Sequence, residues 1–99
     1  MKKITLFCCA GMSTSMLVKR MQNVAQAAGK DYDIAAFSLD NLDEGAGSDV
    51  ILIGPQVRYA LKSVKDKYPD IPVDTIDMRM YGLMDAKGVI ALAEKMMGV

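Results

Sequence analysis

Residues 4–15 read ITLFCCAGMSTS, an apolar run followed by both cysteines of the chain, a glycine and three hydroxyl residues. The apolar run predicts a β-strand over residues 3–7, and the period then becomes helical between about residues 13 and 28. Ser13 or Thr14 is expected to cap this helix. A strand that passes through a glycine-containing loop directly into a helix is typical of an α/β sheet.

The rest of the chain continues the alternation of strand and helix. Strands are predicted over residues 34–37, 50–53 and 73–76, with a helix after the third strand. A polar connection with room for one helical turn precedes the third strand, and a loop follows the fourth. A last helix is predicted between Asp85, its cap, and Gly98, its end. The residues expected to face the core from the helices are Leu17, Met21, Val24, Ala25, Ala28, Val57, Leu61, Val64, Tyr68, Val89, Leu92, Ala93 and Met96.

This order of elements predicts an α/β fold with an open, mostly parallel, four-stranded sheet and helices on both faces. No repeat or linker divides the chain, so a single domain over residues 1–99 is expected. In such sheets ligands bind outside the carboxyl ends of the strands. Cys8, the turn at residues 54–56 and the loop after residue 76 are all expected at that edge.

Composition and charge exclude several classes of protein. Twelve basic residues balance twelve acidic ones, so no net charge draws the chain to nucleic acid or to an anionic membrane. No apolar run approaches the ~20 residues that span a bilayer, and the first residues make a poor signal peptide. A cytoplasmic location with reduced thiols is therefore expected. Histidine is absent, which excludes Ser-His and Cys-His catalysis, and no metal site or organic cofactor is expected.

The two cysteines stand where the predicted strand meets the helix. The unpaired N–H groups and the dipole of a helix start favour an anion and a thiolate. Gly11 permits close backbone approach, and the hydroxyls after it offer donors. This position outweighs the interpretation of Cys8 as a small core residue. We expect Cys8 rather than Cys9 to react, because Cys8 continues the strand and lies at the base of the loop.

Other phosphate-binding loops do not match these residues. The chain has neither the G-x-x-x-x-G-K-[ST] pattern of nucleotide-binding loops nor the G-x-G-x-x-G pattern of dinucleotide-binding loops. Cysteine phosphatases have a similar loop but carry an arginine six residues after the cysteine. Here that place holds Thr14 after Cys8, or Ser15 after Cys9, and the nearest arginine is Arg20.

The missing arginine bears on the reaction. Without a charged group to stabilise the transition state of hydrolysis, the site should be a poor hydrolase. A phosphatase also needs a carboxylic acid, for which Asp77 and Asp85 are the candidates. A sulfur held by amides and hydroxyls can instead keep a phosphoryl group until another acceptor arrives, which describes a phosphocarrier. A phosphatase-like or arsenate-reductase-like enzyme, and a thiol redox or purely structural protein, remain the alternatives.

Three segments carry a resemblance to a known family. LFCCAGMSTSMLVKRM (residues 6–21), DVILIGPQVRYAL (residues 49–61) and DTIDMRMYGLMD (residues 74–85) resemble the IIB subunits of bacterial sugar phosphotransferase systems of the lactose/cellobiose type. The resemblance implies a three-layer sandwich like that of flavodoxin and of low-molecular-weight tyrosine phosphatases. It also implies a phosphotransferase that takes a phosphoryl group from a histidine of a IIA protein and passes it to a sugar bound by the membrane component IIC.

Carried over to this chain, the resemblance makes Cys8 the phosphorylated nucleophile. The phosphoryl oxygens would be held by the loop Cys9, Ala10, Gly11, Met12, Ser13, Thr14 and Ser15. Gln56 and Tyr81 are candidate residues of the site rim, and Met12 and Met16 are candidate apolar contacts for partners.

The resemblance also sets expectations for partners and substrate. The subunit is expected to associate transiently with the inner face of the membrane through IIC, without inserting into it. The expected sugar is a β-glucoside of the cellobiose or chitobiose type rather than lactose. A monomer is expected, because no apolar stripe is left over after the core is assigned.

Overall fold

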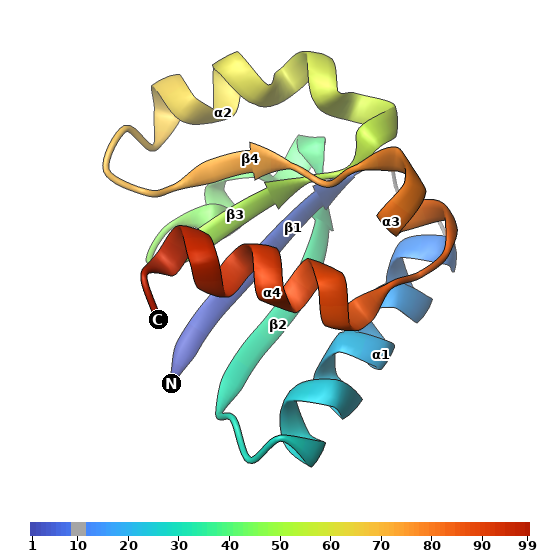
Figure 1. Ribbon diagram of the computed structural model, residues 1–99. Coiled ribbons are helices and arrows are strands. Elements are labelled where there is room, and N and C mark those ends of the chain that lie inside the picture. The colour runs from blue at the N-terminus through green and yellow to red at the C-terminus, as the bar shows by residue number, and fades with distance from the viewer. Residues whose placement is uncertain (9–11) are drawn as a thin grey trace.

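Four parallel strands form the sheet in a computed structural model that describes residues 1–8 and 12–99, the side chains of Met12 and Ser13 excepted (Figure 1). The strand order is β2-β1-β3-β4. The strands are β1 (Lys2–Cys8), β2 (Tyr32–Ser38), β3 (Val50–Ile53) and β4 (Val73–Thr75). All three pairings are parallel, so the carboxyl ends of the strands meet at one edge of the sheet.

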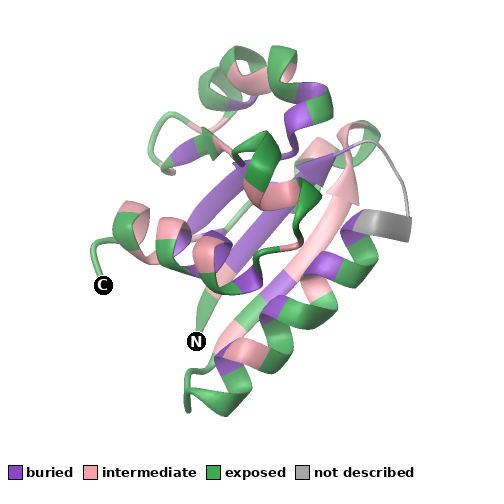
Figure 2. Ribbon diagram, turned by 45° about the vertical axis from the view of Figure 1, so that its right-hand side comes forward, coloured by how far each residue is buried: buried purple, intermediate pink, exposed green. Residues whose placement is uncertain are grey.

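The central strands β1 and β3 are buried on both faces. All four residues of β3 are buried, as are the last five residues of β1, whereas β2 is mostly half-buried (Figure 2). Continuous apolar runs are typical of parallel strands covered on both sides. Thr5 is the polar exception in β1, and its hydroxyl lies 2.6 Å from the Ser48 hydroxyl. This hydrogen bond offsets the cost of burying both groups.

Helices cover both faces of the sheet, as predicted (Figure 1). On one face lie α1 (Met12–Ala27) and α4 (Ala86–Met97), which pack on each other and on the sheet. On the other face lie the 3₁₀ helix η2 (Pro55–Ala60) and α2 (Leu61–Lys67). No helix among residues 1–8 and 12–99 is both long and apolar enough to cross a membrane.

Most predicted core positions are confirmed on α1, α2 and α4. Leu17, Met21 and Ala25 are buried, and so are the predicted core residues Val64 and Val89. The prediction for Ala28 is wrong, because α1 ends one residue earlier and leaves Ala28 exposed. The remaining predicted core residues are buried at Val57 and Ala93 and half-buried at Val24, Leu61, Tyr68, Leu92 and Met96.

Helix starts differ from the predictions in two places. Helix α1 begins at Met12, so Ser13 and Thr14 lie inside it, and neither is its cap. The segment after β3 begins as a 3₁₀ helix rather than an α-helix, because Val57 has non-helical angles (φ −123°, ψ 25°) that interrupt the first turns.

Two connections contain short helices. The polar connection before β3 holds the 3₁₀ helix η1 (Leu39–Gly45), where one helical turn was expected. The predicted loop after β4 contains α3 (Met78–Gly82), which that prediction missed. Helix α3 begins where Asp77 Oδ1 accepts a hydrogen bond of 2.6 Å from the amide of Arg79. Five residues are too few to show a helical period in sequence.

The limits of α4 are confirmed. Asp85 Oδ1 accepts a hydrogen bond of 3.1 Å from the amide of Gly88 and caps the helix. Gly98 ends it in the left-handed conformation, with φ 77°. Glycine is the residue that adopts this conformation without steric cost, and it is therefore the usual residue at such ends.

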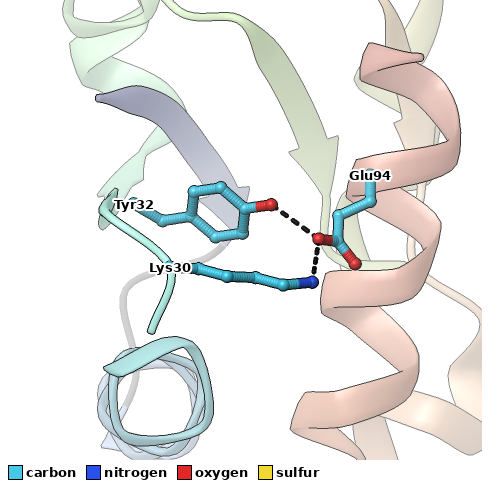
Figure 3. A network of polar contacts seen from close by, with 3 residues as sticks. All are labelled: Lys30, Tyr32 and Glu94. Atoms are coloured by element: carbon cyan, nitrogen blue, oxygen red, sulfur yellow. Dashed lines mark hydrogen bonds and ion pairs between the residues drawn. The ribbon is translucent and has the colours of Figure 1, made fainter. Parts of the chain in front are cut away.

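A polar network ties α4 to the start of β2, at the amino end of the sheet (Figure 3). The Tyr32 hydroxyl donates a hydrogen bond of 2.6 Å to Glu94 Oε2, and the Lys30 ammonium forms an ion pair with the same oxygen. The hydrogen bond to Glu94, together with burial, raises the pKa of Tyr32 to about 12. Hydrogen bonds from Lys30 and then Tyr32 hold the pKa of Glu94 below its usual value.

Candidate functional site

Cys8 is the last residue of β1 and lies at the carboxyl edge of the sheet, as predicted. Its side chain is buried, with 3% of the residue surface exposed. The chain after β3 passes close to it, where the Gly54 amide donates a hydrogen bond of 2.8 Å to the carbonyl of Phe7. A Cβ atom added to Gly54 would lie 2.8 Å from the Cβ of Cys8. Only a glycine therefore fits beside the cysteine without displacing it.

The Cys8 thiol is hydrogen-bonded to one hydroxyl group, which is in turn hydrogen-bonded to a second. Its Sγ lies 3.0 Å from Thr14 Oγ1 and donates a hydrogen bond to it. Thr14 Oγ1 in turn lies 2.8 Å from the hydroxyl oxygen of Tyr81, and either oxygen can donate this bond. Thr14 is 4% exposed and Tyr81 is half-buried. Sulfur and two hydroxyls thus form a chain of hydrogen bonds that runs from β1 through α1 to α3.

The structure brings some of the predicted site residues together. Cys8, Thr14 and Tyr81 are in hydrogen-bonding contact, whereas Ser15 is exposed on α1. Gln56 is also exposed, and its Oε1 would lie 3.5 Å from the Cβ atom added to Gly54, the same atom that meets Cys8. The predicted loop residues Cys9, Ala10 and Gly11, and the side chains of Met12 and Ser13, lie outside the described part of the chain.

One residue that matters at this site was not predicted. Gly54 was expected only as part of a turn at the edge, but it is the residue whose size decides how closely β3 approaches Cys8. The signal in the sequence was a glycine placed directly after a buried strand, at the edge where ligands bind.

The two carboxylates considered for a phosphatase mechanism are both engaged as helix caps. Asp77 accepts from the Arg79 amide at the start of α3, and Asp85 accepts from the Gly88 amide at the start of α4. Among the described residues, no group of three or more histidine, cysteine, aspartate or glutamate side chains is placed to hold a metal ion. One hydroxyl, that of Thr14, is in hydrogen-bonding contact with the Cys8 thiol.

Large apolar side chains are exposed on the elements around this edge. Met16 near the start of α1 is 51% exposed, which agrees with its interpretation as a contact for partners. Tyr59 in η2 is 78% exposed, and Met78 and Leu83, within and just after α3, are 67% and 68% exposed. Exposed apolar groups gathered near one edge are typical of a protein-binding surface.

Comparison with known proteins agrees with the resemblance seen in the sequence. Residues 3–92 match the family described as "PTS system, Lactose/Cellobiose specific IIB subunit". The chain is 46% identical over 104 aligned positions to the galactose-specific EIIB component of Lactococcus lactis subsp. cremoris, and the alignment covers 97% of this chain and 96% of that protein. Identity and both coverages are the same for the cellobiose-specific EIIB component of Lactococcus lactis subsp. lactis.

A solved structure is also similar. The solution structure of the cellobiose-specific phosphotransferase IIB component protein from Borrelia burgdorferi superposes with a TM-score of 0.81. It is 35% identical in sequence, and the match covers 98% of this chain and 92% of that one. The chain therefore belongs to the lactose/cellobiose-specific IIB subunits of the sugar phosphotransferase system (PTS).

Proposed function

We propose that this IIB subunit carries a phosphoryl group on the sulfur of Cys8. IIB components work between a IIA donor and a membrane IIC component, so the carrier group must lie where two partners reach it in turn. The observation that supports Cys8 is its position at the carboxyl edge of the sheet, with its Sγ 3.0 Å from Thr14 Oγ1. In-line phosphoryl transfer depends mainly on positioning and on electrostatic stabilisation by such donors.

The transfer takes place in two steps. The Cys8 thiolate attacks the phosphorus of a phosphohistidine on IIA: the S–P bond forms, the N–P bond breaks, and its electron pair stays on the imidazole nitrogen. A hydroxyl of the sugar bound by IIC then attacks the same phosphorus. The O–P bond forms, the hydroxyl proton is released, and sulfur leaves as a thiolate, ready for the next cycle.

The two hydroxyls have separate roles in this proposal. When Cys8 is a thiolate it accepts rather than donates, so Thr14 Oγ1 must turn its proton toward the sulfur. Tyr81 then donates to Thr14 Oγ1, across the 2.8 Å that separates their oxygens. Hydrogen bonds to a charged acceptor are about twice as strong as those between neutral groups. We assign contacts with the phosphoryl oxygens to the backbone amides of residues 9–15, and a rim position to Gln56.

Hydrolysis is disfavoured at such a site. The residue six places after Cys8 is Thr14, not an arginine, and it already bonds the thiol. The carboxylates of Asp77 and Asp85, the candidates for activating a water, are oriented by hydrogen bonds toward the amides of Arg79 and Gly88. A phosphoryl group on Cys8 is then retained until the acceptor arrives, as a carrier requires.

We extend the proposal to location and substrate. Residues 1–99 act as a single IIB domain, as a monomer in the cytoplasm that meets the membrane only through IIC. The sugar is a β-glucoside of the cellobiose type, because the Borrelia protein and one Lactococcus relative are described as cellobiose-specific. An equally similar relative is galactose-specific, so phosphorylation of the two sugars by the assembled system is the comparison that tests this choice.

Intact-mass spectrometry at neutral to alkaline pH tests the carrier role. The protein is incubated with phosphoenolpyruvate, enzyme I, the histidine carrier protein and the cognate IIA. One added phosphoryl group is expected, and prior alkylation of Cys8 should prevent it. The Cys8→Ser variant should accept none, while the matched Cys9→Ser variant should keep most of the acceptance. Equal loss in both variants would contradict the assignment of Cys8.

A further inference from the structure

A shallow groove lies between helix α1 and the connection that leads from α3 into α4. Figure 1 shows these elements side by side. The groove consists of two hollows of about 590 and 540 Å³, which share Asn23, Val24 and Lys87. We call it the α1–α4 groove. Its remaining lining residues are Arg20, Ala27, Ala28, Leu83, Met84, Asp85 and Ala86.

Much of the α1–α4 groove is apolar and uncovered. Leu83 is 68% exposed at one wall, and Ala27 and Ala28 are exposed at the other. A large apolar side chain that leaves water on binding is the usual anchor of a protein interface. The groove therefore offers a partner an apolar contact that the chain does not cover with its own residues.

Two cations stand on opposite walls of the groove. Arg20 projects from α1 and Lys87 from the first turn of α4; both are exposed, and neither forms an ion pair with another described residue. The acidic residue of the lining, Asp85, is engaged with the Gly88 amide at 3.1 Å. Asp85 keeps its negative charge while it accepts this bond, so the lining carries two positive charges and one negative charge. Its net charge is positive, which is complementary to carboxylates.

The α1–α4 groove lies within reach of a partner seated on Cys8. Arg20 follows Thr14 by six residues, which is about 9 Å along the helix. Leu83 follows Tyr81, the other residue of the hydroxyl chain, by two residues. A standard protein interface covers about 800 Å² on each partner, so one that is centred near Cys8 extends over the end of the groove that holds Arg20 and Leu83.

We propose that the α1–α4 groove docks an acidic segment of the IIA donor, with an apolar side chain against Leu83 and carboxylates facing Arg20 and Lys87. The choice of IIA over the permease follows from charge. Cytoplasmic loops of membrane proteins carry an excess of lysine and arginine, which two unpaired cations would repel. This inference rests on the proposed function to the extent that IIA must reach Cys8.

The test measures binding rather than phosphoryl transfer, so that it is independent of the chemistry at Cys8. The affinity of the cognate IIA is measured by calorimetric titration in the Cys8→Ser background, alone and with Arg20→Glu and Lys87→Glu together. The matched control carries Lys62→Glu and Lys65→Glu, an equal charge change at exposed positions of α2 on the opposite face of the sheet. Thermal melts confirm that each variant is folded.

Reversal of the groove charges should raise the Kd for IIA about tenfold and reverse or remove its dependence on salt. The control pair should change the Kd less than about twofold, because its charges lie on the opposite face of the sheet from the groove. Leu83→Ala, which keeps both cations, should also weaken binding, and it provides the apolar arm of the test if the double variant does not fold.

Two results would overturn the proposal. An unchanged Kd for IIA in the folded groove variants would show that the groove is not a docking site for the donor. Weaker binding to membrane vesicles containing the IIC permease, with IIA binding intact, would assign the groove to the permease instead. Failure of the proposed carrier role would appear separately, as absence of a phosphoryl group on the wild-type protein in the mass experiment.

Discussion

Gly54→Ala should disturb the protein through a single crowded contact. The added Cβ would stand 2.8 Å from the Cβ of Cys8, well inside the roughly 3.5–4.0 Å at which two carbon atoms attract each other. Backbone strain does not contribute, because Gly54 has φ −62° and ψ 147°, which alanine adopts freely. The neighbouring atom is attached directly to the backbone of a buried central strand, so it cannot swing aside as a flexible side chain would.

The strands must separate by roughly 0.7 Å or more to relieve this contact, taking 3.5 Å as the near limit for two carbon atoms. Overpacking of this kind costs about 1–3 kcal/mol. In a domain of this size, about 2 kcal/mol lowers the Tm by roughly 10 °C. The displaced Cys8 should also accept phosphate more slowly, because its Sγ leaves the 3.0 Å contact with Thr14 Oγ1.

Calorimetry gives the Tm, and intact-mass spectrometry gives the rate of phosphate acceptance from IIA. Gly82→Ala is the matched control, because a Cβ there meets no atom within 4 Å. It should leave the Tm unchanged or raise it slightly, since alanine is favoured over glycine in a helix. If Gly54→Ala melts within about 2 °C of the wild type, the close approach of β3 to Cys8 is not a tight contact and the reasoning fails.

Other predictions concern the hydroxyl chain and the polar network. Tyr81→Phe should slow phosphate acceptance by about three- to tenfold, which corresponds to the net free energy of one hydrogen bond. Its affinity for IIA should be unchanged, and a loss of affinity without slower acceptance would contradict the positioning role of Tyr81. Thr14→Val should slow acceptance further, and Thr14→Ser should restore it, measured by the same mass assay. The folded-state pKa of Glu94 is lowered, so its stabilising effect is present above its unfolded pKa, near 4.5, and is lost as the pH falls through the folded value. The difference in Tm between wild type and Glu94→Gln should therefore shrink in acid. The pKa of Tyr32 is raised, so the stabilising effect of its hydrogen bond is present below pH 10.0 and is lost as the pH rises toward about 12. In Tyr32→Phe this part of the decrease in Tm at alkaline pH should be absent.

The strands and their succession along the chain could be predicted from local pattern, whereas their order in the sheet could not. Residues 50–53 were predicted as a strand, and β3 has those limits, because a short, wholly apolar and mostly β-branched run bounded by polar and glycine residues is typical of a strand covered on both faces. The first strand was predicted to end at Phe7, whereas β1 extends to Cys8, which pairs with Ser38 of β2. The end of a strand depends on its neighbour, and a single run of residues does not contain that information.

The position of the candidate nucleophile also followed from the chain alone. A cysteine between a buried strand and a helix must lie at the carboxyl edge of a parallel sheet, whatever the rest of the fold does. Thr14 was correctly placed near this loop, but its expected role as a possible helix cap was wrong. Helix α1 begins two residues before it, and its hydroxyl is turned to Cys8 and Tyr81 instead.

The sequence pattern placed the segments that carry Cys8, Gly54 and Tyr81 at one edge of the sheet, but it did not indicate which of their atoms are in contact. Tyr81 bonds Thr14 across 67 residues, and Gly54 meets Cys8 across 46. Both contacts exist because α3 and the turn after β3 are carried to the same edge by packing on opposite faces of the sheet. The α1–α4 groove likewise needs both helices in place. Local periodicity reports which side of an element is apolar, but only the packed sheet brings two elements within a few ångströms of each other.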